Sequence, residues 1–362
     1  MGYRYIGAKS KILTEILPVI EEIAGPGACV ADLMCGTSSV SAELRRKGFS
    51  VVANDLMTYA YHHARVSLLF TSHPSFELAK PFIEEFCPDF SEELFPLTPY
   101  EQILRALANV PPCEDYFYRE FSIKGHPHNT GKPRNYFSPA NARKIDGIRK
   151  WLRILRDSKL ITELERSLLL HDLIMGANDV ANIAGTYGHY MARLIGRARD
   201  TLHLTPTQLL IVQDAGKHTV LQGYAEEVAP QIKCDLCYID PPYMKRQYAA
   251  NYHILETIAR EDEPDAIGVS GLRPWRDQYS NFCTRTRIHD SFRRIFTAMK
   301  CPHFLLSYNE DGLLSLKEIK TLLSEFGTVR VTLFSNKRFK SNSSKLSPTV
   351  TEYLLHLHKQ SS

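Results

Sequence analysis

The feature that most restricts the fold of this chain is a strand-like run that ends in two consecutive prolines. Residues 234–239 are mostly apolar and rich in strand formers, which predicts a buried β-strand. Asp240, Pro241, Pro242 and Tyr243 follow directly. Because proline has no N–H to donate, the two prolines end the strand and hold Asp240 and Tyr243 on a rigid loop. Open α/β sheets bind their ligands at this edge, so the run predicts a site there.

The residues of this loop have the chemistry to activate an exocyclic amine of a nucleobase. Such an amine is a poor nucleophile because its lone pair is delocalised into the ring. The Asp240 carboxylate and the Pro241 carbonyl can each accept one of its N–H bonds, which makes the lone pair available for attack. The base must first leave the duplex, and the ring of Tyr243 can offset the lost stacking. The alternative without function is a strand-ending turn that happens to contain these residues.

A second pattern, near the N-terminus, is typical of the nucleotide-binding half of a doubly wound fold. A predicted strand at residues 29–31 leads into a loop, a helix at 41–47 and a second strand that ends at Asp55. The acid can accept both hydroxyls of a ribose. Gly36 is the only glycine of the loop, which suits an adenosyl ligand without phosphates better than a pyrophosphate. Strand–helix packing without a ligand remains the alternative.

The remaining patterns predict an α/β protein whose doubly wound, Rossmann-like sheet is interrupted by a largely helical insertion. Residues 1–56 and 206–362 form the predicted sheet domain, and residues 57–205 form the insertion. The insertion has no long periodic element at residues 71–115. Further helices are predicted at residues 138–156, 162–175, 180–199, 291–299 and 316–326, and further strands at 207–212, 304–307, 329–334 and 351–357.

The basic residues are concentrated in one part of the chain. The net charge is only +4, so a nucleic-acid partner must be argued from where the charge lies. Residues 119–156 contain ten lysines and arginines but only two acidic residues. Lys124, Lys132 and Arg134 share one loop, and this predicts contacts with DNA phosphates and base edges. A solvated helix face with an adjoining loop is the alternative.

The cysteines and the apolar runs restrict the location of the protein. The eight cysteines are scattered and no secretory signal precedes them, which favours reduced thiols and a cytoplasmic protein. Cys234 and Cys237 lie three residues apart in a strand and therefore face opposite sides, and no second ligand pair follows. We therefore expect no metal site. No apolar run is long enough to span a membrane.

These motifs together resemble the S-adenosylmethionine-dependent N6-adenine DNA methyltransferases of bacterial restriction–modification systems. The resemblance covers most of the chain. The order of the motifs matches the α arrangement, in which the cofactor motif precedes the target-recognition region and the Asp-Pro-Pro-Tyr motif. The matching segments are the N-terminal motif at residues 5–9, the cofactor loop at 32–38, Asp55, residues 135–151, 178–190 and 246–257, and the tail at 338–342.

The resemblance implies a function for individual residues. Asp240, Pro241, Pro242 and Tyr243 would hold the adenine, and Arg246 and Lys340 would join the DNA contacts. The implied S-adenosylmethionine ligands are Tyr5, Lys9, Asp32, Met34, Gly36, Thr37, Ser38 and Asp55. Three of these depart from the family pattern: Tyr5 replaces Trp, Met34 replaces Phe and Ser38 replaces a glycine. Tyr224 stands where an acidic residue often contacts the cofactor, which leaves open whether Tyr224 or Glu226 does so here.

We therefore expect an enzyme that methylates N6 of a flipped-out adenine in double-stranded DNA. Such an enzyme would be the modification enzyme of a restriction–modification system, with a cognate endonuclease that acts on the same site. The alternatives with the same fold are cytosine N4, RNA adenine and a protein glutamine as targets. Asp240 favours adenine over cytosine, and the basic stretch argues against glutamine. A DNA-binding relative without turnover would not need Asp240 to Tyr243, and no acidic cluster supports a nuclease.

Overall fold

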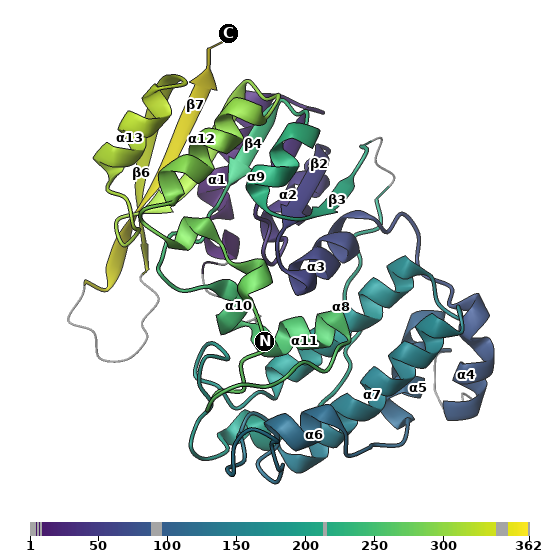
Figure 1. Ribbon diagram of the computed structural model, residues 1–362. Coiled ribbons are helices and arrows are strands. Elements are labelled where there is room, and N and C mark those ends of the chain that lie inside the picture. The colour runs from purple at the N-terminus through teal and green to yellow at the C-terminus, as the bar shows by residue number, and fades with distance from the viewer. Residues whose placement is uncertain are drawn as a thin grey trace. The chain divides into compact units, whose positions relative to one another are not determined.

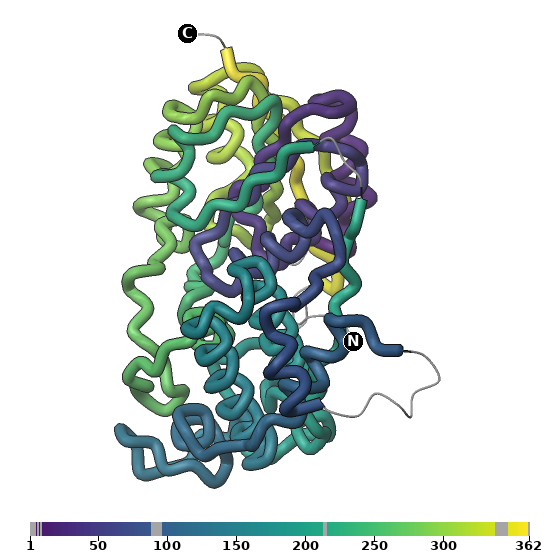
Figure 2. Tube along the Cα trace, turned by 90° about the vertical axis from the view of Figure 1, so that its right-hand side faces the viewer, coloured from purple at the N-terminus to yellow at the C-terminus, as the bar shows by residue number. Residues whose placement is uncertain are grey.

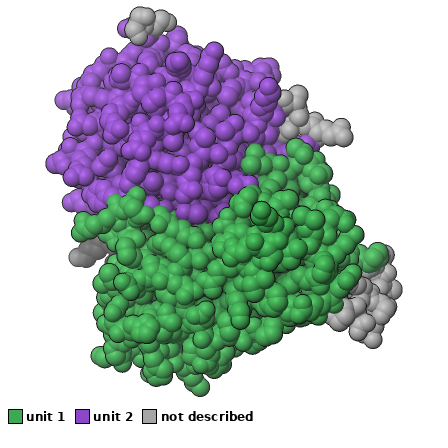
Figure 3. All heavy atoms as spheres, turned by 45° about the vertical axis from the view of Figure 1, so that its right-hand side comes forward, with its two compact units in different colours: residues 1–6, 69–211, 249–277 green, residues 7–68, 212–248, 278–362 purple. Residues whose placement is uncertain are grey.

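The computed structural model describes residues 5, 7, 9–87, 96–212, 216–337 and 347–360. The chain divides into two compact units, which Figure 3 shows in different colours. The sheet unit contains Gly7–Leu68, Val212–Tyr248 and Gln278–Ser362, and the helical unit contains Met1–Ile6, Leu69–Ile211 and Ala249–Asp277. The chain therefore passes repeatedly between the units, and its course can be followed by colour in Figure 2.

These units differ from the predicted domain and insertion at the short segments 1–6 and 206–211 and at two longer segments. Residues 58–68 form a helix of the sheet unit, whereas residues 249–277 belong to the helical unit. The second segment contains helix α11 (His253–Arg260), which packs on helix α8 (Glu163–Asp179). Helix α11 buries its apolar side in this contact. The segment therefore belongs to the helical unit, although it follows the Asp-Pro-Pro-Tyr motif in the sequence.

One sheet of seven strands forms the centre of the sheet unit (Figure 1). The strand order is β3-β2-β1-β4-β5-β7-β6, in which the first five strands are parallel and β7 runs antiparallel to β5 and β6. The order reverses between β1 and β4, which is where doubly wound sheets form their binding crevice. The predicted Rossmann-like fold is thus confirmed. The strands are β1 (Cys29–Asp32), β2 (Ser50–Asp55), β3 (Thr219–Gln222), β4 (Leu236–Ile239), β5 (His303–Asn309), β6 (Gly327–Lys337) and β7 (Thr349–Lys359).

Helices cover the sheet on both faces, and so all four residues of β4 are buried. Three helices, α9, α12 and α13, lie together on the near face in Figure 1 and enclose an apolar core with the sheet. Helix α1 packs on β4 and β5, α2 on β1 and β2, and α3 on β2 and β3. The bounds are α1 (Leu13–Ala24), α2 (Ser39–Arg46), α3 (Thr58–Leu68), α9 (Ala225–Val228), α12 (Ile288–Ala298) and α13 (Leu316–Ser324).

The helical unit is built around α7 (Pro139–Asp157) and α8, which pack on each other. Their starts follow from capping residues. The Ser138 hydroxyl accepts a hydrogen bond from the backbone N–H of Asn141, and Thr162 forms a capping box with Glu165. The other helices are α4 (Lys80–Phe86), α5 (Pro99–Asn109), α6 (Tyr116–Phe121), α10 (Tyr248–Asn251) and α11. Both units also contain short 3-10 helices, which are η1 (Lys9–Lys11), η2 (Glu77–Ala79), η3 (Gly196–Arg199), η4 (Ala229–Gln231), η5 (Arg276–Gln278) and η6 (Asn281–Cys283).

The predicted strand at residues 207–212 was wrong. This segment is irregular because side chains of the helical unit bind its polar groups. The Thr207 N–H donates to the Tyr100 hydroxyl at 2.9 Å, and the Thr207 hydroxyl donates to Asp172 at 2.7 Å. The strand of this region is instead β3, which pairs with β2.

Two predictions for the helical unit were also wrong. Residues 180–195 form no helix, because the Asn182 side chain forms hydrogen bonds with backbone groups in and near this segment. Its amide donates to the Asn135 and Met191 carbonyls, and its oxygen accepts from the Ile195 N–H at 3.0 Å. Residues 71–115, predicted without a long periodic element, contain the eleven-residue helix α5. A capping box of Thr98 and Glu101 starts it.

All eight cysteines are free thiols. Among the residues that the structure describes, no cluster of His, Cys, Asp or Glu has the geometry of a metal site. No helix in the described ranges has the length and apolar character needed to cross a membrane.

Candidate active site

Asp240 directly follows β4 and forms a buried ion pair with Lys9. The Lys9 Nζ lies 3.1 Å from the Asp240 Oδ1, and the side chains are 6% and 16% exposed. A direct contact of this kind is needed to offset the cost of removing two charges from water. The structure thus brings Lys9, which was predicted as a cofactor ligand, into contact with the predicted catalytic loop.

Burial and the neighbouring charges determine the pH at which the Asp240 carboxyl group ionises. Burial raises the pKa of Asp240 to about 6, and the neighbouring Lys9 ammonium opposes a larger rise. For Lys9, burial acts to lower the pKa, but Asp240, Tyr243 and Glu352 outweigh it and hold the pKa above its usual value. Near neutral pH, Lys9 is therefore positive and most Asp240 side chains are ionised acceptors.

Tyr243 is held in place by residues at the end of β5. The Asn309 side-chain amide donates to the Tyr243 hydroxyl at 3.1 Å. The ring of Tyr308 lies 5.2 Å from the ring of Tyr243, and the Lys9 Nζ lies 5.5 Å from the same ring centre. These contacts fix the orientation of the half-buried aromatic ring that was predicted to stack on a base.

Glu352 is a residue of this site that the sequence analysis missed. It lies on β7, is buried, and places its Oε2 4.0 Å from the Lys9 Nζ. Its negative charge raises the pKa values of both Lys9 and Asp240. The signal in the sequence was an acidic residue inside the mostly apolar, strand-forming run at residues 350–357. Asn309 gave no comparable signal, since polar residues are common where a strand ends.

The loop between β1 and α2 is shaped by Asp55 at the end of β2. The Asp55 carboxylate accepts hydrogen bonds from the backbone N–H of Gly36 at 2.8 Å and of Met57 at 2.9 Å. Gly36 and Ser38 have φ angles of 51° and 61°, in the left-handed region that favours glycine. Glycine at the position of Ser38, as in the resembling family, would adopt this backbone without strain.

Asp32 ends β1 and accepts a hydrogen bond from the Ser41 hydroxyl at 2.6 Å. Burial raises the pKa of Asp32 to about 7, and the charges of Asp240 and Asp55 add to the rise. The carboxylates of Asp240 and Asp55, on the two neighbouring strand ends, therefore act on Asp32 at this edge of the sheet. Such an edge favours a positively charged ligand.

The other predicted cofactor residues have different surroundings. Met34 packs on the sheet core, and the Thr37 hydroxyl lies 3.4 Å from the Ser39 hydroxyl. Tyr5 belongs to the helical unit, where its ring stacks on Tyr252 at a centroid distance of 4.8 Å.

The sequence left open whether Glu226 or Tyr224 contacts the cofactor. The two residues have different surroundings in the structure. The buried Glu226 carboxylate accepts hydrogen bonds from the Ser291 hydroxyl at 2.5 Å and from the Asn281 amide at 3.5 Å. Glu226 therefore has structural partners that hold α9 to α12. Tyr224 is half-buried and follows β3 at the same sheet edge as Asp55.

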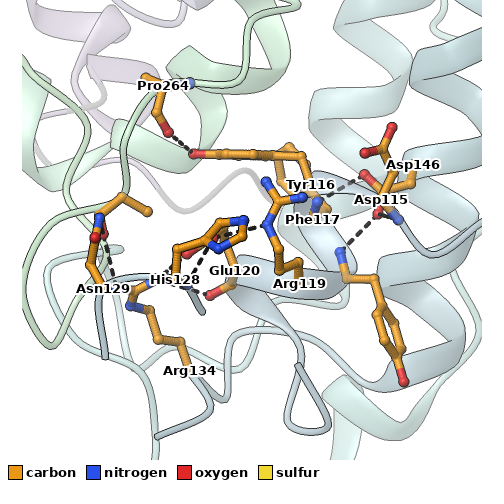
Figure 4. A network of polar contacts seen from close by, with 12 residues as sticks. Asp115, Tyr116, Phe117, Arg119, Glu120, His128, Asn129, Arg134, Asp146 and Pro264 are labelled. Atoms are coloured by element: carbon orange, nitrogen blue, oxygen red, sulfur yellow. Dashed lines mark hydrogen bonds and ion pairs between the residues drawn. The ribbon is translucent and has the colours of Figure 1, made fainter. Parts of the chain in front are cut away.

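Arg134 requires a correction, because the side chain predicted to contact DNA is fully buried, and Figure 4 shows it among its polar contacts. Its Nη1 lies 2.6 Å from the Glu120 Oε2, and its Nη2 donates to the carbonyls of Ala266 at 2.9 Å and Gly268 at 3.0 Å. The guanidinium thus ties the base of its own loop to residues 266–268. It holds a loop in place and has no exposed surface for a phosphate.

The other arginines of the basic stretch are also paired within the helical unit. Arg149 is buried and donates to the carbonyl of Asp262, and its Nη1 lies 3.6 Å from Asp146. The acidic partners come from the same stretch, from the residues just before it and from residues 261–263. The remaining pairs are Arg119–Glu120, Arg143–Glu114, Arg153–Glu263 and Arg156–Glu261. The excess of positive charge in the sequence is therefore largely neutralised in the folded unit.

The lysines of the basic loop remain available. Lys124 and Lys132 are exposed, and neither forms an ion pair with any residue in the described part of the chain. Arg246 is exposed in the sheet unit, and its backbone carbonyl lies 3.4 Å from the Cys283 Sγ. Lys340 lies outside the described residues.

Comparison with known proteins gives a consistent result. The sequence profile of the family described as D12 class N6 adenine-specific DNA methyltransferase matches residues 5–331. The Type II methyltransferase M.FokI of Planomicrobium okeanokoites is 31% identical, over 98% of this chain and 52% of its own length. The modification methylase StsI of Streptococcus sanguinis is 28% identical, over 99% and 52%. The Type II methyltransferase M.NlaIII of Neisseria lactamica is 29% identical, over 98% and 99%. The chain thus spans about half the length of the first two relatives and nearly all of the third.

Proposed function

This chain belongs to the D12 class N6 adenine-specific DNA methyltransferases, and we propose that it transfers a methyl group from S-adenosylmethionine to N6 of an adenine flipped out of double-stranded DNA. The observation that carries the proposal is the largely buried Asp240 carboxylate, held beside Lys9 on the Asp-Pro-Pro-Tyr loop at the switch point of the sheet.

Asp240 and Tyr243 receive the adenine in this proposal. The Asp240 carboxylate accepts a hydrogen bond from one N–H of the N6 amine, and the Pro241 carbonyl accepts one from the other. The nitrogen lone pair is then less delocalised into the ring and is available for attack on the methyl group. The ring of Tyr243 stacks on the extruded base and offsets part of the lost stacking energy. Asn309 fixes this ring through the Tyr243 hydroxyl, so the platform is in place before the base arrives.

Lys9 keeps Asp240 in its accepting state. Without a cation, burial would favour the protonated carboxyl, which loses part of its acceptor capacity. Glu352 is a second carboxylate near the ammonium, at 4.0 Å, and helps to fix its position. When N6 loses a proton on methylation, an ionised Asp240 is the nearest acceptor that the chain itself provides.

The edge of the sheet fits S-adenosylmethionine. The carboxylates of Asp55 and Asp240, which act on Asp32 at this edge, suit a ligand that carries positive charge, as this one does at its ammonium and sulfonium groups. Asp55 would hold the ribose, and Met34, Gly36, Thr37 and Ser38 would line the loop, while Asp32 keeps its Ser41 contact and contributes charge. Bound there, the cofactor supplies a methyl group that its sulfonium has already activated. Tyr5 as a cofactor contact stays a sequence-based prediction.

Contact with DNA is proposed for the exposed cations Lys124, Lys132 and Arg246, and for Lys340 on the evidence of the sequence alone. Because similar chains are named Type II methyltransferases and modification methylases, we also propose that this one modifies the site of a restriction endonuclease. The residues outside the family motifs, rather than Asp240, would determine that site.

The test is transfer of a labelled methyl group to duplex DNA, followed by single-molecule sequencing of the product. We expect N6-methyladenine in one short sequence. Asp240→Ala should lower turnover by about 10²-fold or more, the scale of a positioned proton acceptor, while cofactor binding is kept. The matched control is Asp235→Asn at the exposed, opposite end of the same strand, which should keep full turnover. N4-methylcytosine as the product, or normal turnover by Asp240→Ala, would refute the assignment.

A further inference from the structure

Three buried oxygen atoms of the sheet unit have no hydrogen-bond partner among the residues that the structure describes. They are the Tyr238 hydroxyl, the Ser307 hydroxyl and the Oε2 of Glu352. The three residues are 1%, 1% and 5% exposed, so bulk water does not reach them. A buried polar atom costs free energy unless it forms a hydrogen bond, and such atoms therefore indicate a bound water or a role in catalysis. We refer to these three residues as the polar row.

The side chains of the polar row lie on one face of the sheet. Strand β5 lies between β4 and β7, and its Leu305 pairs with Tyr238 while its Asn309 pairs with Glu352. Because side chains alternate along a strand, Leu305, Ser307 and Asn309 share a face, and residues paired with them point to the same side. Ser307 is therefore placed midway between Tyr238 and Glu352, and the row crosses three neighbouring strands.

The polar row ends at the buried ion pair of the candidate active site. Lys9 and Asp240 belong to the same unit, and the Lys9 Nζ lies 3.1 Å from the Asp240 Oδ1. The same Nζ lies 4.0 Å from the Glu352 Oε2, which is too long for a direct hydrogen bond. A polar contact of this length fits a water that bridges the two groups. Buried waters form about three hydrogen bonds, and the hydroxyl of Ser307 provides a further partner.

The groups of this cluster act on one another electrostatically. Burial raises the pKa of Tyr238 well above its usual value, the charges of Asp240 and Glu352 add to the rise, and the Ser307 hydroxyl opposes it. Tyr238 therefore keeps its proton and can donate. Burial acts to lower the pKa of Lys9, and the Asp240 carboxylate is the largest of the effects that raise it. When Asp240 takes up a proton, this effect ceases and Lys9 releases a proton more readily.

We propose that Glu352 is the internal acceptor of the proton that N6 loses on methylation, and that a buried water held by Ser307 and Tyr238 delivers it. Asp240 first takes the proton from N6. Lys9 then passes one of its protons to the water, which releases another to Glu352, and Lys9 recovers a proton from Asp240. Only N–H and O–H bonds form and break, and one proton moves from N6 to the Glu352 carboxylate. After product release, the reverse sequence returns it through Asp240 to the solvent. The inference rests on the proposed function, since methylation of the amine produces the proton.

The test measures the rate of methyl transfer in H2O and in D2O, and we call the ratio of the two rates the isotope ratio. A single turnover, with protein in excess over the duplex that the wild-type protein methylates, keeps product release from hiding the chemical step. Glu352→Gln keeps the size of the side chain and removes the proton acceptor. Ser307→Ala removes one partner of the water and leaves both carboxylates beside Lys9. The matched control is Glu310→Gln, which neutralises an exposed carboxylate that accepts from the Thr351 N–H of β7.

Glu352→Gln should lower the rate by about 10²-fold, the scale of a positioned proton acceptor. Its isotope ratio should exceed that of the wild-type protein, because loss of the proton has become the slow step. Ser307→Ala should lower the rate on the order of tenfold, as expected for one lost hydrogen bond, and should also raise the isotope ratio. Glu310→Gln should match the wild-type protein in both quantities.

The isotope ratio separates the relay from a purely structural role. A slow Glu352→Gln variant with the wild-type isotope ratio overturns the relay and leaves Glu352 as a residue that positions Lys9. A normal rate for Glu352→Gln, or a wild-type isotope ratio for Ser307→Ala, also overturns it. Ser307→Ala decides the question where Glu352→Gln does not fold. A wild-type chain that methylates no DNA refutes the proposed function and the relay with it, whereas an active wild type with unchanged ratios in both variants refutes the relay alone.

Discussion

At the scale of single residues, the Lys9 ammonium has the largest predicted effect on the Asp240 carboxylate. Burial raises the pKa of Asp240 to about 6 even with Lys9 in contact, so removal of the cation would let it rise further. Only the ionised carboxylate accepts fully from an amine, and activity should therefore be lost as the pH falls through this pKa.

We predict that kcat/KM of the wild-type protein falls below about pH 6, and that Lys9→Met moves this acid limb upward by about 1–3 pH units, the usual effect of a contacting opposite charge. Raising the pH should then restore part of the lost activity. A pH–rate profile measures the shift. Lys11→Met, in the same short helix but exposed, should leave the limb unchanged. A Lys9→Met limb that stays near pH 6 would contradict the role given to Lys9.

The Tyr243 side chain contributes through its ring more than through its hydroxyl. Tyr243→Phe removes the hydrogen bond from Asn309, and we expect a loss of about 0.5–1.5 kcal/mol in transition-state stabilisation. Tyr243→Ala removes the ring as well, which should cost a further 1–3 kcal/mol or so. Both values follow from kcat/KM. Equal losses in the two variants would mean that the ring does not stack on the base.

The sequence predicted Asp240, Tyr243 and Asp55 because each ends or follows a strand in a recognisable motif. It did not predict the contact of Lys9 with Asp240 and Glu352, since these residues come from three distant parts of the chain. Local periodicity shows that a residue is buried, but not which residue it meets.

At the scale of elements, the buried pair of Arg134 and Glu120 should stabilise the helical unit. Arg134→Met leaves the buried Glu120 carboxylate with only the partly exposed Arg119 as a cation, and we expect a loss of about 3–5 kcal/mol in the free energy of unfolding. Urea unfolding followed by circular dichroism measures this loss. Lys132→Met changes an exposed cation two residues away and should alter stability by less than about 0.5 kcal/mol. Similar values for the two variants would refute the structural role of Arg134.

The positions of strands were predictable where consecutive residues are buried, because such strands have an apolar sequence. The strands β1, β2, β4, β5 and β7 contain predicted strand segments because helices cover them and they read as apolar runs. The edge strand β6 also contains a predicted segment, although none of its described residues is fully buried. β3 was missed because it has only four residues and none is fully buried. Residues 207–212 have the composition of a strand, but Tyr100 and Asp172 of the helical unit bind Thr207 instead.

At the scale of the whole molecule, the net charge of +4 and the pairing of the arginines limit the electrostatic part of DNA binding. We predict that neutralising Lys124 and Lys132 together flattens the dependence of log Kobs on log salt by about one unit for each phosphate that a lysine no longer neutralises. Affinity should fall for all sequences. Arg143→Gln with Arg153→Gln removes equal charge from ion-paired positions and should change the slope much less. An unchanged slope in the lysine variant would exclude that loop from binding the phosphates.

The position of β7 inside the sheet has a consequence for synthesis of the protein. β7 lies between β5 and β6 and carries Glu352, yet of the seven strands of this sheet it is the last in the sequence. Until it emerges, β5 has an open edge, β6 has no partner and Lys9 lacks one of its two carboxylates. An interrupted translation product therefore combines an incomplete catalytic site with exposed strand edges, which invite aggregation and proteolysis. We expect methylation of cellular DNA to begin only with chains in which β7 has been synthesised.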